Sequence, residues 1–169
     1  AYLAEAMVRM VIDSGILPPG ALQTIVGQTH DLFDHLTGQD VVSFTGSADT
    51  AAMLQRHPVI GREAVRFIAE RDSLNASILG PDAGPGTPEF DLFIKGVRAE
   101  MTVKAGQKCT AIRRILAPKA HVPAVIEALS AALAKVRIGH PGLETTQMGA
   151  LASLAQRKDV REKVAALQA

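Results

Sequence analysis

The residue with the most reactive side chain in this sequence is its single cysteine. Cys109 lies in the run "KAGQKCTAIRR", after a predicted helix and before a predicted strand. A lone cysteine is most often a small buried apolar residue. Gly106 interrupts the helix just before it, which favours a loop over a packed face. Nearby cations favour the reactive thiolate, and four lie close in sequence: Lys104, Lys108, Arg113 and Arg114.

Several carboxylates could serve as a general base, and one of them is better placed than the others. The candidates in this part of the chain are Glu63, Glu70, Asp72, Glu89 and Glu100. Glu70 ends the apolar run "EAVRFIAE", so we expect it half buried at the carboxyl edge of a sheet, where ligands of doubly wound folds gather. Partial burial would make it a better base.

The run "VVSFTGSADTA" holds a second candidate site. It reads as a strand that delivers Thr45, Gly46 and Ser47 to the start of a helix. The first N–H groups of a helix and its positive dipole end can bind an anion, and a glycine lets a ligand approach the main chain. The alternative is an ordinary strand-to-helix turn with a serine cap.

Composition and the remaining reactive residues exclude several functions. The five histidines (30, 35, 57, 121 and 140) show no metal-ligand spacing, and none lies near Cys109 in sequence. We therefore expect no metal, and a Cys–His pair only by tertiary proximity. A net charge of +1 gives no reason to expect nucleic acid as a partner. No apolar run reaches the roughly 18–20 residues of a membrane span. A cytoplasmic location is the default for a chain with one thiol.

The elements that must position these residues alternate between helix and strand. Predicted helices cover 1–15, 30–37, 47–57, 89–104, 120–136 and the chain from about 153. Predicted strands cover 22–27, 39–47, 63–70, 75–80 and 110–118. This order predicts an α/β fold: part of a doubly wound, Rossmann-like parallel sheet followed by the start of a second α/β domain.

The order of the motifs resembles the aldehyde dehydrogenase superfamily. The resemblance rests on "SGILPPGALQTIVG", "SFTGS", a strand ending in Glu70, "AGQKCT" and "ALAKVRIGHPGLETTQMGALAS". It implies an NAD- or NADP-dependent oxidation in which Cys109 attacks an aldehyde and its N–H binds the oxyanion. Glu70 would activate the water that hydrolyses the thioester, and Thr45, Gly46 and Ser47 would contact the cofactor. Residues 1–71 would then be the C-terminal half of the cofactor-binding domain, and 72–169 the N-terminal part of the nucleophile-bearing domain.

The sequence also departs from the usual pattern of that family. Arg71-Asp72-Ser73-Leu74 replaces Leu-Gly-Gly-Lys after the glutamate, and Ala51 stands where a second glycine is usual. The run from Ala69 to Ile115 is similar to a narrower branch, the aldehyde dehydrogenase domains of bifunctional ring-opening proteins in bacterial phenylacetate degradation. A CoA-linked semialdehyde is therefore a candidate substrate.

The same resemblance predicts what the whole protein is. The four basic residues around Cys109 are candidates to attract CoA phosphates. The chain lacks the family's upstream asparagine and lysine and its downstream cofactor motif and oligomerisation strand, so we expect it to be the middle of a longer, homo-oligomeric enzyme and inactive alone. Two alternatives remain: a CoA-acylating enzyme, in which a thiol replaces water, and a non-catalytic nucleotide-binding fragment.

Overall fold

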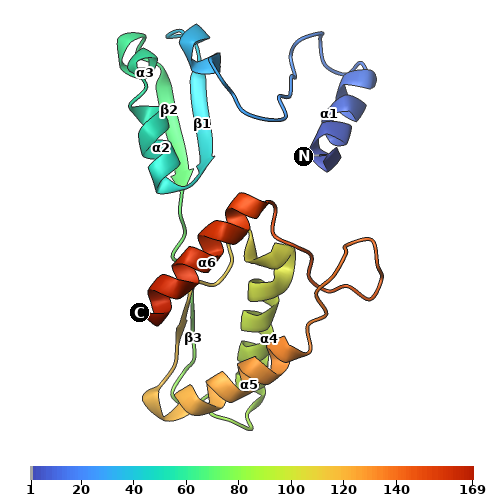
Figure 1. Ribbon diagram of the computed structural model, residues 1–169, viewed down its shortest axis with the longest axis vertical. Coiled ribbons are helices and arrows are strands. Elements are labelled where there is room, and N and C mark those ends of the chain that lie inside the picture. The colour runs from blue at the N-terminus through green and yellow to red at the C-terminus, as the bar shows by residue number, and fades with distance from the viewer. Residues whose placement is uncertain (1) are drawn as a thin grey trace. The chain divides into compact units, whose positions relative to one another are not determined.

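The computed structural model describes residues 2–169, and the chain separates into two compact units, Ala1–Arg71 and Asp72–Ala169. Both strand pairs are parallel, one in each unit. Helices accompany both pairs (Figure 1). The expected α/β class is therefore confirmed. No helix of the described residues is long and apolar enough to cross a membrane.

The first unit is built on the parallel pair β1–β2. Its elements are α1 (Tyr2–Asp13), η1 (Leu32–His35), β1 (Val41–Gly46), α2 (Ala48–Gln55), α3 (Pro58–Arg62) and β2 (Arg66–Arg71). Helix α2 connects the strands and contacts both. Its Ala51 is fully buried. Val59, Ile60 and Val65 form a small core against which Phe67 packs. Period-2 alternation in β2 places Phe67 on this side and Ile68 on the exposed one.

One predicted strand of this unit is absent. The run 22–27 has no regular secondary structure and is largely exposed. The β-branched residues of that run favour a strand, but a strand forms only where a neighbouring backbone completes its hydrogen-bond ladder. No described residue pairs with this run. Local propensity was therefore not enough, and this prediction was wrong.

The second unit packs two helices beside a short parallel pair. Its elements are β3 (Ala76–Ile78), α4 (Pro88–Thr102), η2 (Val103–Gly106), β4 (Arg114–Leu116), η3 (Lys119–His121), α5 (Val122–Ala134) and α6 (Leu154–Gln168). Phe90, Ile94 and Val97 of α4 meet Val125 and Leu129 of α5 in its core. These residues recur at helical spacing on one face of each helix.

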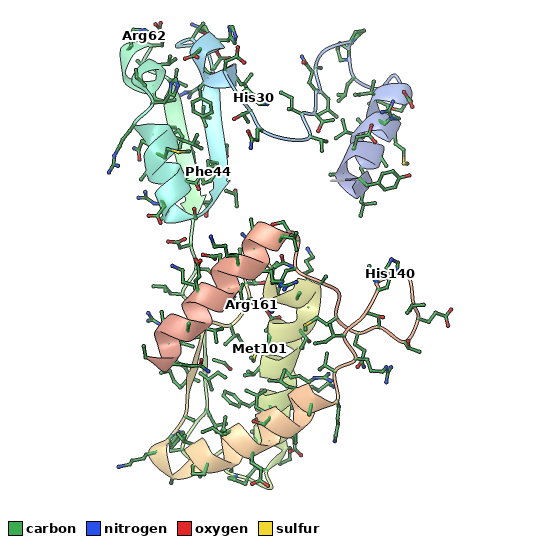
Figure 2. All side chains as sticks on the ribbon, in the orientation of Figure 1. His30, Phe44, Arg62, Met101, His140 and Arg161 are labelled. Atoms are coloured by element: carbon green, nitrogen blue, oxygen red, sulfur yellow. The ribbon has the colours of Figure 1, made fainter. Side chains whose placement is uncertain are left out.

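Two helices of this unit, α4 and α6, begin at a residue whose side chain caps the first turn. The Thr87 side chain accepts a hydrogen bond from the Phe90 N–H, and the Ser153 side chain accepts one from the Gln156 N–H. Each cap satisfies an N–H that the first turn of a helix leaves without a partner. Helix α4 ends at Thr102, and Met101, labelled in Figure 2, lies in its last turn. The polypeptide that carries Cys109 follows from that end.

Candidate active site

The parallel β1–β2 pair brings several predicted site residues to one edge. Thr45 is opposite Glu70 and Gly46 is opposite Arg71 in the register of the two strands. Because both strands run in the same direction, their carboxyl ends open at the same edge, where ligands of α/β sheets bind. Thr45, Gly46 and Glu70 are therefore neighbours, and Ser47 follows Gly46 directly.

Ser47 is the N-cap of α2, and its hydroxyl is committed to that helix. Its Oγ accepts a hydrogen bond from the Thr50 N–H at 3.2 Å and donates one to Thr50 Oγ1 at 2.9 Å. An anion at this end would therefore meet backbone N–H groups and the positive end of the dipole rather than the serine hydroxyl. Gly46 and Ser47 are exposed. Ala51, at the position of the family's second glycine, points into the core instead.

Glu70 differs from its prediction in one respect. It lies at the carboxyl end of β2 as expected, but its side chain is exposed rather than half buried. The alternation of β2 explains the difference, since Phe67 and Ala69 face inward and Glu70 shares the outward face with Ile68. Glu70 is thus accessible to water and to a ligand at this edge.

Cys109 lies in an irregular turn of the second unit, and its thiol is exposed. The approach to it is backbone in the left-handed region: φ is 52° at Lys104, 54° at Ala105 and 72° at Gly106. A side chain at Gly106 would also come within 3.3 Å of the Met101 carbonyl oxygen. Left-handed backbone costs a non-glycine residue about 1–2 kcal/mol, so the surrounding structure must hold this segment in place. The prediction of a loop rather than a packed helix face at Cys109 was correct.

Two side chains bind the carbonyl groups around Cys109. Asn75 donates from Nδ2 to the Cys109 carbonyl oxygen and, at 3.4 Å, to that of Ala111. Arg113 donates from Nη2 to the Lys108 carbonyl at 3.1 Å and from Nη1 to the Ala111 carbonyl at 3.2 Å. We call Asn75 and Arg113 the carbonyl clamp. The Cys109 N–H itself has no acceptor among residues 2–169.

Two neighbours of Cys109 are tied to more distant parts of the unit. Lys108 Nζ lies 2.8 Å from Glu100 Oε2 of α4, and the two side chains are only 20% and 34% exposed. Gln107 accepts a hydrogen bond from the Ala152 N–H at 2.8 Å and donates one to the Lys104 carbonyl at 3.0 Å. The ion pair with Glu100 therefore neutralises the charge of Lys108.

Four of the five histidines, 35, 57, 121 and 140, have partners of their own among the described residues. In the second unit, His121 Nε2 lies 3.3 Å from the Pro81 carbonyl oxygen, and His140 Nδ1 accepts a hydrogen bond from the Gly142 N–H. In the first unit, the His57 ring packs edge-on against Phe33. Within residues 2–169, no three His, Cys, Asp or Glu side chains gather as a metal site would require.

Sequence reasoning missed Asn75. It is the only asparagine of the chain and stands 34 positions before Cys109. No spacing rule links two residues so far apart in different loops. The nearest signal is its position at the start of β3, since β3 and β4 pair in parallel and the Cys109 turn leads into β4.

The chain has an α/β fold, an exposed thiol on a loop held by side-chain hydrogen bonds, and a capped helix after a Gly-Ser turn. Known proteins resemble it in sequence and in fold. The chain belongs to the aldehyde dehydrogenase family, which it matches over residues 1–169. It is 53% identical over 168 residues to the 3,4-dehydroadipyl-CoA semialdehyde dehydrogenase of Aromatoleum evansii, covering 99% of this chain and 33% of the relative. It is 30% identical over 154 residues to the bifunctional protein PutA of Escherichia coli, covering 87% of this chain and 11% of that protein.

Solved structures agree on the fold. The crystal structure of betaine aldehyde dehydrogenase from Staphylococcus aureus in complex with NAD+ has a TM-score of 0.79 at 23% identity, covering 94% of this chain and 30% of that one. The chain thus spans about a third of the length of the first relative and of this structure. The family predicted from the order of the motifs is confirmed.

Proposed function

We propose that the full-length protein oxidises an aldehyde to a carboxylic acid with NAD+ or NADP+, through a thioester on Cys109. The observation that carries the proposal is the Cys109 turn: an exposed thiol on a loop held by four hydrogen bonds from two side chains, with its own N–H unpaired among residues 2–169. Membership of the aldehyde dehydrogenase family supports the same reading.

The chain's own residues supply a nucleophile, an oxyanion donor and a base. The Cys109 thiolate attacks the aldehyde carbon, and the Cys109 N–H donates to the oxygen that becomes negative. A bound dinucleotide would supply the hydride acceptor, and the carbon attached to Cys109 would then be at the oxidation level of a thioester. Glu70 takes a proton from water, the hydroxide attacks the thioester carbonyl, and the Cys109 thiolate leaves as the acid forms. Glu70 is exposed at its strand end, which supports access of water to it.

The edge at the carboxyl ends of β1 and β2 suits a dinucleotide. Gly46 and Ser47 are exposed at the start of α2, and the Ser47 hydroxyl already caps that helix. The pyrophosphate would then be held by main-chain N–H groups with Thr45 beside it, and the cofactor would serve as the hydride acceptor. The buried methyl of Ala51 leaves this surface unchanged.

We further propose a CoA-linked semialdehyde as the substrate, because the relative from Aromatoleum evansii carries that substrate in its name at 53% identity. Two of the four basic residues around Cys109 are engaged within the protein, Lys108 with Glu100 and Arg113 with main-chain carbonyls. Lys104 and Arg114, both exposed, are therefore the better candidates for CoA phosphates.

The remaining proposals concern the whole protein. Its one cysteine is exposed, which suits the reducing cytoplasm, because an exposed thiol is readily oxidised elsewhere. We also propose a homo-oligomer, as the family resemblance implies, and light scattering of the full-length protein tests it.

The experiment that tests the function is a screen of the full-length protein for reduction of NAD+ and NADP+ with short, aromatic and CoA-linked aldehydes. We expect turnover without added thiol and the highest kcat/KM with a CoA-linked semialdehyde. Turnover that requires free CoA would identify the CoA-acylating alternative. If no aldehyde is oxidised and none protects Cys109 from alkylation, the proposal is wrong and the non-catalytic alternative stands.

A further inference from the structure

We propose that the carbonyl clamp, Asn75 and Arg113, positions the nucleophile loop and fixes the direction of the oxyanion-binding N–H of Cys109. This inference rests on the proposed function, since it assigns two further residues to the same site. Both act through the main chain of Cys109 and are positioning residues rather than catalytic ones.

Arg113 acts on the peptide group that precedes Cys109. The Lys108 carbonyl, which accepts from Arg113 Nη2 at 3.1 Å, shares a peptide plane with the Cys109 N–H. The peptide is trans, so its C=O and N–H point in opposite directions. Holding the carbonyl against the guanidinium therefore aims the Cys109 N–H away from it. A charged donor makes this a strong hydrogen bond.

Asn75 acts on the peptide group that follows Cys109. Its Nδ2 holds the Cys109 carbonyl oxygen, while its own carbonyl oxygen accepts from the N–H groups of Arg113, at 2.8 Å, and Arg114, at 3.2 Å. One residue at the start of β3 therefore binds the nucleophile and the segment that leads from it into β4. Both peptide planes that flank the Cα of Cys109 are fixed.

The backbone before the loop explains why two such residues are needed. The left-handed residues Lys104 and Ala105 raise the energy of the conformation that leads into the turn. Without the clamp the turn is free to relax toward ordinary φ values, and the Cys109 N–H loses its direction. The thiol stays exposed in either case, so its simple accessibility does not depend on the clamp.

This difference between accessibility and direction gives the test, in the full-length protein. We expect Arg113→Met and Asn75→Asp each to slow the first-turnover burst of reduced cofactor about ten- to hundredfold, the usual cost of a small misplacement at a reacting centre. The final extent of Cys109 labelling by excess iodoacetamide, which reports whether the thiol is exposed, should equal that of wild type. The dissociation constant for the dinucleotide should not change. Arg113→Lys, which keeps one charged donor, should recover part of the burst rate.

Matched controls make the same chemical changes elsewhere in the unit. Arg157→Met removes an exposed arginine from α6. Gln147→Glu makes the same amide-to-carboxylate change at a side chain whose oxygen accepts a hydrogen bond from the Arg137 N–H at 3.0 Å. A carboxylate oxygen can keep that hydrogen bond. Both should leave the burst rate at the wild-type value.

Several outcomes would overturn the clamp. A wild-type burst rate in both Asn75→Asp and Arg113→Met would refute it. A loss of Cys109 alkylation in parallel with the burst, or a loss of folding in both variants, would show that these residues have only a structural role. If wild type itself gives no burst with any aldehyde, the proposed function fails separately. Amide hydrogen exchange across 107–112 then decides the clamp alone, since faster exchange in both variants is expected and unchanged exchange refutes it.

Discussion

Replacing Glu70 by glutamine separates the two halves of the proposed reaction. The change is nearly isosteric, and the Glu70 side chain is exposed at the end of β2 with no ion pair among the described residues. An exposed polar substitution of this kind changes the free energy of unfolding by no more than about 0.5 kcal/mol. Any large kinetic effect of Glu70→Gln can therefore be assigned to the chemistry.

The expected magnitude follows from the role of a base. General base catalysis contributes about 10²- to 10⁴-fold, which is about 3–5.5 kcal/mol of barrier. Attack by the Cys109 thiolate and loss of hydride precede the step that needs Glu70. We therefore expect Glu70→Gln to keep a burst of about one reduced cofactor per active site and to lose steady-state turnover by about that factor.

Stopped-flow absorbance of the full-length protein measures both phases in one trace, and acid quenching with mass spectrometry should find the acyl group on Cys109. Glu127→Gln is the matched control, because Glu127 is an exposed carboxylate of α5. Equal loss of burst and turnover would mean that Glu70 does not act in deacylation. Wild-type turnover in Glu70→Gln would assign the base to another residue.

Three further predictions follow from single side chains. Cys109→Ala should abolish burst and turnover together, so hydride transfer that survives it in stopped flow contradicts a covalent mechanism. Ser47→Ala removes the cap of α2 and should lower the free energy of unfolding by about 1 kcal/mol in urea titration; dinucleotide affinity measured by calorimetry should fall less than tenfold, because the hydroxyl is already bonded to Thr50. Val97→Ala at the centre of the α4–α5 core, where Val97 is 1% exposed, should cost about 2–3 kcal/mol in the same titration, and a loss below 0.5 kcal/mol would show that the core closes over the cavity.

Local sequence signals were sufficient for the longer helices and for the interruption of the helix before the thiol. The serine cap considered at Ser47 is the N-cap of α2, and the last helix begins at Ser153 as predicted, because a cap acts within its own first turn. Gly106 predicts the interruption before Cys109 because a positive φ is a property of one residue. The short helix α3 was not predicted. Residues 22–27 were wrongly given a strand, because strand formation depends on a partner from elsewhere in the chain.

The sequence by itself therefore determined the family, the longer helices, four of the five predicted strands and the identity of the exposed thiol. Each of these depends on motifs and on neighbours within a few residues. Tertiary structure alone decided what surrounds that thiol. Asn75 reaches Cys109 across 34 positions, and Lys108 turns to Glu100 instead of toward a ligand. Hydrogen bonds and ion pairs of this kind depend on how distant segments are brought together, and no local pattern encodes them.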